Sequence, residues 1–489
     1  MKARVLLASA AALALAACVG GRPPEIATPA PVLPASFLYS PSGTEQASLA
    51  ALLPSDDPAF NQLADTALAA SPTLAEALAR IDQARAQADR AGAERLPSIG
   101  ADGNVIGSRI NAGQFGGALP PGVAIDSEQI SYGANLTARW DPDLFGGLRA
   151  QERAANLRIT AAQAGAAAVR LALVAEIAAA VIDFRTLDRR AEEIRSDVAA
   201  AEELARLGGV RERAGIAPGF DRVRAEAQAA ASRSRLEALE SERVRLIGRL
   251  ATLSATGGAE VRAALSGGAP DITLPPPPAA TPSLLLVNRP DVQRAAADLL
   301  AADADLAATA RQRFPRLTLS SALGLLAFGL GDLFDTDSIV GSLGAGIAAP
   351  LLDFGRIEAE VAGAAAAERA AFAAYRGTVF TALGDAEAAY GLVAAADREA
   401  AAAVAERDAA QRAARLANTR FRAGLTDFLT VLEARRAADA SGERAAAAVG
   451  RAQRARVLLW QALGGEPGQV TADSTPEAFS QASNNTRSP

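Results

Sequence analysis

Histidine is absent from the 489 residues, and lysine and cysteine each occur once, as Lys2 and Cys18. A chain without histidine cannot use a Ser–His pair, and a chain without lysine beyond its first residues has no Schiff-base or P-loop lysine. A lone cysteine has no disulfide partner in the chain. No paired-acid constellation and no cluster of metal ligands stands out. The sequence therefore predicts a protein that is not an enzyme and that needs no metal or cofactor.

Basic residues are slightly outnumbered, with 49 Lys and Arg against 55 Asp and Glu, and the net charge of -6 gives no reason to expect nucleic acid as a partner. Apolar residues make up 50% of the chain, but alanine supplies much of this fraction. Beyond the N-terminus we expect no membrane-spanning helix. The longest later apolar stretches, residues 322–331 and 343–352, have about the length of a strand in a membrane barrel.

The N-terminus predicts export. A basic start is followed by an apolar run at residues 5–14 that is too short to span a bilayer, which indicates a signal peptide at residues 1–17. The sequence Leu-Ala-Ala-Cys that ends at Cys18 resembles the lipobox of bacterial lipoproteins, and it implies cleavage before a lipid-modified Cys18. Val19 follows where an aspartate would favour the inner membrane, which favours the outer membrane. The alternative is an ordinary signal peptide beside an incidental cysteine.

The chain contains the same motifs twice in the same order, which indicates two tandem repeats at residues 59–256 and 284–465. The motifs are Arg-Leu-Pro at Pro97 and Arg-Phe-Pro at Pro315, Leu-Phe-Gly at Gly146 and Asp-Phe-Gly at Gly355, and Arg-Ala-Gly at Gly215 and Gly424.

Three further segments have a composition unlike that of the repeats. Residues 257–283, which contain four consecutive prolines, are expected to form an extended linker between the repeats. Residues 18–58 are predicted to be an extended, proline-rich segment after the lipid. Residues 466–489 are predicted to be a flexible tail.

Each repeat contains two stretches with the period-two pattern of a strand. The clearest has apolar residues on one face and polar residues on the other. The apolar face, which we predict to contact lipid, consists of Tyr132, Ala134, Leu136, Ala138 and Trp140. A soluble sandwich strand would show the same alternation. About four strands per chain cannot close a barrel around a lumen, and a sheet in lipid must close, so several chains are expected to share one barrel.

Long alanine-rich helices follow the strands. From Leu157 to Ile182 apolar residues recur at alternating steps of four and three, which predicts a left-handed coiled coil. A helix of about 50 residues would be about 75 Å long, a length suited to a conduit across the periplasm.

The duplicated motifs, in this order, resemble the TolC-like outer-membrane efflux proteins, in particular their NodT/OprM lipoprotein branch. The resemblance covers about residues 57–465. It implies an α+β membrane protein in which a homotrimer forms a twelve-stranded β-barrel, continued by a coiled-coil tunnel. It also implies a location in the outer membrane, a periplasmic adaptor, an inner-membrane pump of the RND class, and passive export of small molecules.

Two sets of site residues follow from the resemblance. The turns Ala214-Gly215 and Ala423-Gly424 match the hairpin tips at which relatives meet their adaptors, although a glycine there also simply ends a helix. Asp427, Leu429 and Glu433 match the segment that narrows the periplasmic entrance, where three copies would form an apolar ring and an acidic ring.

Alternatives to this gate remain open. Relatives carry aspartate where Glu433 stands. Glu433 could instead pair with Arg436 on a solvated helix face, and Asp427 could instead cap the following helix. Which of the two acids forms the narrowest ring, and what the channel exports, cannot be predicted. The rival to the channel is a periplasmic coiled-coil lipoprotein, a scaffold or adaptor without a pore.

Overall fold

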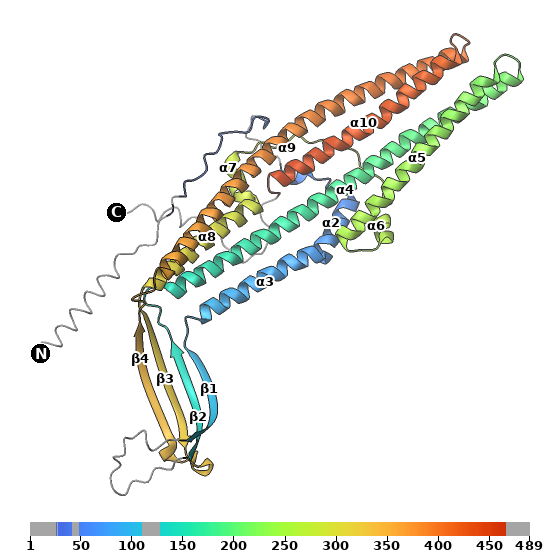
Figure 1. Ribbon diagram of the computed structural model, residues 1–489. Helices are drawn as coiled ribbons and strands as arrows, with labels where there is room; N and C mark the ends of the chain where they lie inside the picture. Colours follow the sequence, from blue (N-terminus) through green and yellow to red (C-terminus); the bar gives the residue numbers. More distant parts are fainter. Residues whose placement is uncertain (1–25, 27, 42–47, 110–127, 466–489) are drawn as a thin grey trace, which may run out of the picture. The chain divides into compact units, whose positions relative to one another are not determined.

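The fold repeats one series of elements twice, as the tandem motifs predict (Figure 1). The structure, a computed structural model, describes residues 26, 28–41, 48–109 and 128–465. The first series is α3 (Pro72–Ala93), β1 (Ser98–Arg109), β2 (Glu128–Trp140), α4 (Gly147–Arg213) and α5 (Gly219–Ser254). The second series is α8 (Pro290–Ala310), β3 (Arg316–Ala327), β4 (Ile339–Ala348), α9 (Arg356–Arg422) and α10 (Phe428–Ala462).

Shorter elements lie before, between and within the two series. They are the 3-10 turn η2 (Leu49–Leu52), α2 (Pro58–Ala70), α6 (Gly258–Leu265), α7 (Pro282–Asn288), η4 (Arg311–Arg313), η5 (Leu330–Asp332) and η6 (Thr336–Ser338). The described part of the chain forms two compact units, one of residues 26, 28–29, 81–109, 128–161 and 295–374, and one of residues 30–41, 48–80, 162–294 and 375–465. Each unit therefore draws on both repeats.

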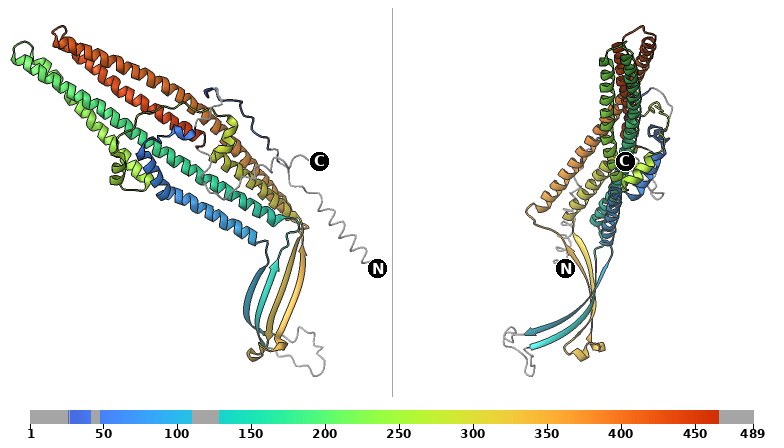
Figure 2. Two further views of the ribbon diagram at one scale, coloured as in Figure 1. Left: turned by 180° about the vertical axis from the view of Figure 1, so that it is seen from behind. Right: turned by 90° about the vertical axis from the view of Figure 1, so that its right-hand side faces the viewer.

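The first unit contains a four-stranded antiparallel sheet with the strand order β1-β2-β3-β4 (Figure 2). Strands from the two repeats meet at its centre, where Leu136 of β2 lies opposite Leu323 of β3. Gly324 is needed there because a Cβ atom at this position would lie 2.7 Å from the backbone oxygen of Ala134 on the neighbouring strand. The strands β1 and β4 are the two edges, and each is paired on one side only.

Both strand-to-helix connections use the same local chemistry. Asp143 and Phe354 have positive φ angles of 50° and 52°, as do the glycines of the duplicated Phe-Gly motif. The Asp143 carboxylate accepts hydrogen bonds from the backbone N–H groups of Leu148 and Arg149 at 3.0 and 2.9 Å, which caps the start of α4. Asp353 does the same for α9, accepting from Ile357 at 2.9 Å. The pKa of Asp353 is lowered by these backbone hydrogen bonds.

The second unit is held by a core of buried apolar side chains from both repeats, including Ile177, Leu250, Tyr390 and Leu459. A buried ion pair lies within the same unit. The Arg185 guanidinium contacts the Asp57 carboxylate at 2.8 Å and donates to the carbonyl oxygens of Leu265 and Gly267 at 3.0 Å. Asp57 also caps α2 by accepting from the Ala59 N–H at 2.9 Å. The Asp57–Arg185 pair thus joins the start of α2, helix α4 and the linker.

The N-terminal segment before α2 packs on the second unit where it is described. The Phe37 ring is buried and lies 5.5 Å from the Tyr390 ring. The Tyr390 hydroxyl donates to the Pro278 carbonyl at 2.8 Å, so this residue joins the N-terminal segment and the linker. Burial raises the pKa of Tyr390 to about 12.

Three expectations need correction. The linker is only partly extended, because Gly258–Leu265 forms helix α6, in which Val261 and Leu265 share one face and are buried; the four prolines lie outside any helix. Helices α4 and α9 each have 67 residues and are about 100 Å long, so both exceed the expected length of about 50 residues. Both are also long and apolar enough to pass for a membrane span by composition alone, against the expectation of none. The abundance of alanine explains this result.

Candidate functional site: a two-faced sheet and two helical hairpins

The strand register sorts the sheet into one apolar and one polar face. Tyr132, Ala134, Leu136, Ala138 and Trp140 share a face with the residues that lie opposite them on both neighbouring strands. These neighbours on β1 and β3 are Ile99, Ala101, Gly103, Val105, Leu319, Ser321, Leu323, Leu325 and Ala327. The face continues on β4 with Ile339, Leu343 and Ile347, and its large side chains are exposed, Leu343 to 87%.

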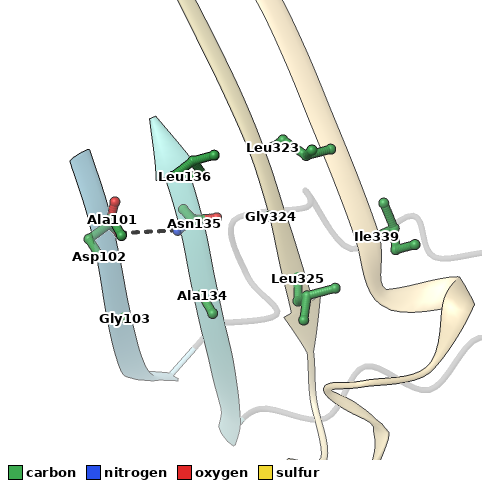
Figure 3. A pocket seen from close by; sticks show the side chains of 10 residues that line it. All are labelled: Ala101, Asp102, Gly103, Ala134, Asn135, Leu136, Leu323, Gly324, Leu325 and Ile339. Carbon is green, nitrogen blue, oxygen red and sulfur yellow. Dashed lines mark hydrogen bonds between the residues drawn. The ribbon is translucent and has the colours of Figure 1, made fainter. Parts of the chain in front are cut away.

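Exposed side chains of this size on one sheet face are compatible with lipid and costly in water. A shallow hollow of about 630 Å³ lies on the sheet, where Ala101, Gly103 and Ala134 leave space beside Leu325 and Ile339 (Figure 3). The alternation predicted for β2 continues on the neighbouring strands with three exceptions, because the exposed Ile106, Leu326 and Val340 lie on the opposite face.

The opposite face carries polar and small side chains. Its polar residues include Asp102, Asn135, Thr137, Thr318 and Ser320, and they outnumber the large apolar side chains there. The Asn135 amide donates to the Asp102 carboxylate at 3.2 Å across the β1–β2 pair (Figure 3). A face of this kind can line water, so the sheet has the two surfaces that the wall of a water-filled barrel requires.

Two helical hairpins lie in the second unit. The first hairpin joins α4 to α5 through residues 214–218, and the second joins α9 to α10 through residues 423–427. Gly215 and Gly424 have φ angles of 72° and 75°. In both turns the glycine N–H and the N–H after it bond back to the last helical carbonyls, as in a Schellman motif. The repeated Arg-Ala-Gly motif thus produces two equivalent helix ends.

The two hairpins differ just beyond these turns. Phe428 is buried beside Phe421, with ring centroids 6.0 Å apart, whereas Phe220 at the matching place is 62% exposed. Asp427 caps α10 by accepting from the Thr430 N–H at 2.7 Å, and these Thr430 hydrogen bonds lower its pKa. Pro218 at the corresponding position of the first hairpin makes no side-chain cap.

The predicted gate residues lie at the start of α10. Leu429 and Glu433 are four residues apart on this helix and both are exposed. The alternative pairing of Glu433 is not formed, because the Arg436 guanidinium donates instead to the Gln228 side-chain oxygen at 2.7 Å. The capping role considered for Asp427 is the one the structure has.

A buried polar cluster joins the two hairpins and was missed from the sequence. The Asp197 carboxylate of α4 is buried, contacts Arg235 of α5 at 2.9 Å, and accepts from the Ser232 hydroxyl. Arg235 also contacts Glu443 of α10 at 2.5 Å. Asp439 of α10 completes the cluster.

Asp439 differs electrostatically from the other members of this polar cluster. Burial, together with the adjoining Asp197 carboxylate, raises the pKa of Asp439 to about 8, and one of its oxygens has no hydrogen-bond partner among the described residues. The Asp197–Asp439 pair therefore holds a proton up to a higher pH than a free aspartate would. No sequence signal indicates this pair, because its members come from different repeats.

Together these features define a subunit of a β-barrel membrane channel with a long helical part. The chain belongs to the outer membrane efflux protein family, whose model matches residues 63–256 and 281–465.

It is 32% identical over 411 residues to the pyoverdine export outer membrane protein OpmQ of Pseudomonas aeruginosa. The aligned residues are 83% of this chain and 85% of that protein. It is 26% identical over 499 residues to nodulation protein T of Rhizobium leguminosarum bv. viciae, with 98% and 97% covered. The structure of the outer-membrane channel OprN matches with a TM-score of 0.81 and 28% identity over 91% of this chain and 99% of that chain.

These findings confirm the family, the fold class, the function as an outer-membrane component of an efflux system, and the location in the outer membrane. Cys18, whose lipid modification is a prediction, and the predicted tail lie outside the described residues. The gate, the adaptor-contact tips and the lipid-facing residues stay predictions.

Proposed function

We propose that three copies of this chain assemble into one twelve-stranded barrel and form a passive export conduit for small molecules. The observation that carries this proposal is the sheet, which has an apolar exposed face and two edges, β1 and β4, that are paired on one side only. Unpaired backbone groups are costly in lipid, so the edges must pair with copies of the chain. A scaffold without a pore would leave both edges and the apolar face unsatisfied.

The conduit works with a periplasmic adaptor and an inner-membrane pump of the RND class. The hairpin tips support an adaptor contact, because Ile216, Phe220 and Leu425 are each at least 62% exposed beside the turns of Ala214-Gly215 and Ala423-Gly424. Exposed apolar side chains on a helical end fit a protein partner. A photo-crosslinker at Ile216 is expected to capture a periplasmic adaptor in cells, and one at exposed Leu392 of α9 is the control. Equal capture at both positions would contradict the tip contact.

The periplasmic entrance is closed by the start of α10 in this proposal. Leu429 and Glu433 are exposed on one helix and would form an apolar and an acidic ring in a trimer. Replacing both by alanine is expected to raise the single-channel conductance in a planar bilayer severalfold. Replacing Leu416 and Glu406, which are also exposed but lie on α9, is the control. An unchanged conductance in the Leu429→Ala/Glu433→Ala variant would contradict the gate.

We infer that the channel carries out no reaction and binds no cofactor. Within residues 26–465, where described, no group of three or more metal-ligating side chains occurs.

A lipid on Cys18 anchors the chain in this proposal. The lone thiol behind an apolar leader supports the anchor. Mass spectrometry of the purified chain is expected to show a lipid at Cys18 that a Cys18→Ala variant lacks. An unmodified mature N-terminus elsewhere would contradict the anchor.

A further inference from the structure

The polar face of the sheet carries two guanidinium groups near the end at which the strands join the helices. Arg139 lies one residue before the end of β2, and Arg316 is the first residue of β3. Arg139 shares its face with Ser98 and Ser320, its register partners, and Arg316 shares this face because it is four residues from Ser320 on the same strand. Both are exposed, and neither contacts a carboxylate among the described residues.

Acidic side chains do not balance these arginines on the same face. Among the strand residues the one carboxylate on the polar face is Asp102, which lies four residues along β1 from Ser98 and is hydrogen-bonded to Asn135. Directly after the end of β2, the Asp141 carboxylate accepts a hydrogen bond from the Asp143 N–H at 3.0 Å, and the Asp143 carboxylate caps α4. Within the four strands, no free carboxylate on the polar face therefore offsets the positive charges of the two guanidinium groups.

We infer that Arg139 and Arg316 form two positive rings inside the base of the barrel, which favour organic anions, such as carboxylates and phosphates, as the exported class. This inference rests on the proposed trimer, in which the polar face lines the lumen. Guanidinium groups suit carboxylates and phosphates because their planar donors match these anions.

The size of the barrel makes such rings effective. Twelve strands about 4.8 Å apart and tilted by about 40° enclose a wall about 24 Å across. An inward-pointing guanidinium lies about 8 Å from the axis, which is close to one Debye length at physiological salt. Three such charges, screened over that distance in water, raise the anion concentration on the axis about threefold at each ring.

The test is the reversal potential of the purified trimer in a planar bilayer under a KCl gradient, in a Leu429→Ala/Glu433→Ala background so that the entrance does not limit the current. The Arg139→Gln/Arg316→Gln variant is expected to lower the anion-to-cation permeability ratio at least twofold. Arg139→Lys/Arg316→Lys is expected to retain it. The matched control is Arg109→Gln, because Arg109 is also a strand arginine but lies on the other face and contacts Glu128 at 3.5 Å.

An unchanged ratio in the glutamine variant would overturn the inference while leaving the channel intact. A trimer without conductance in any background would instead contradict the proposed pore. If the glutamine variant fails to assemble on a native gel, a salt series on the parent channel decides. Raising KCl from 0.1 to 1 M shortens the Debye length from about 10 to about 3 Å, so the anion preference must fall, and a preference that stays constant would refute the rings.

Discussion

Asp439 is expected to make the stability of this channel depend on pH in a range where the rest of the chain hardly titrates. The chain has no histidine, and its one cysteine and one lysine lie in the N-terminal 18 residues. Burial raises the pKa of Asp439 to about 8, whereas Tyr390 titrates only at about 12. Since the folded-state pKa of Asp439 lies above its unfolded value, it contributes stability that is complete below about pH 4 and is lost as the pH rises through about 8.

The expected magnitude follows from this pKa. Between pH 6 and pH 9.5 the folded state loses a proton that the unfolded state has already lost at pH 6. The folded-state pKa lies about two units above pH 6, so the free energy of unfolding falls by about 3 kcal/mol over this range. Because Asp439 is only partly buried, solvent screening reduces the effect to about 1 to 2 kcal/mol. Groups facing Asp439 are Asp197 of α4, Arg235 of α5 and Arg435 of α10. The lowering effect of the two arginines is already contained in the pKa of about 8.

The assay is guanidinium unfolding of the detergent-solubilised protein, followed by helical circular dichroism at pH 6 and pH 9.5. The parent protein is expected to lose about 1 to 2 kcal/mol per chain, and Asp439→Asn is expected to lose almost nothing. Glu399→Gln is the control, because the hydrogen bond from Arg451 lowers the pKa of Glu399 and keeps it ionised at both pH values. A pH dependence that survives in Asp439→Asn would refute the reasoning.

Three further predictions follow from single contacts. Leu136→Arg on the apolar face is expected to cost about 2 to 4 kcal/mol and to reduce membrane assembly on a native gel, whereas Thr137→Arg on the polar face should assemble normally. Asp57→Ala leaves the buried Arg185 without its partner and should lower the free energy of unfolding by about 3 to 5 kcal/mol, a loss that an unchanged unfolding midpoint would exclude. Gly424→Ala, at a φ of 75°, should cost about 1 kcal/mol in the same assay, and no change would contradict a strained turn.

Local periodicity is sufficient to predict the two faces of strand β2, and the duplicated motifs are sufficient to predict the repeat. Side chains alternate strictly along a strand, so the residues around Leu136 fall on one face whatever the register. The turn at Gly424 was also predictable, because a glycine after a long helix is a common helix end. The proline-rich composition of residues 257–283 predicts an extended linker and does not indicate helix α6, although Val261 and Leu265 are spaced as on a helix face.

Contacts between the repeats could not be predicted in the same way. The Asp197 and Asp439 pair joins residues from α4 and α10, and no local pattern indicates which faces of two long alanine-rich helices meet. The pairing of β2 with β3 is likewise a choice between repeats, and it decides which strands are left as edges. Whether Arg139 and Arg316 lie on the same face depends on the register between β2 and β3. The alternation along a single strand does not give this register.

The most direct test of the account is the mass of the assembled particle by native mass spectrometry from detergent. Because β1 and β4 are edges in a single chain, we predict one particle with three times the mass of the mature chain. A stable single-chain particle that stays in solution without detergent would contradict the shared barrel.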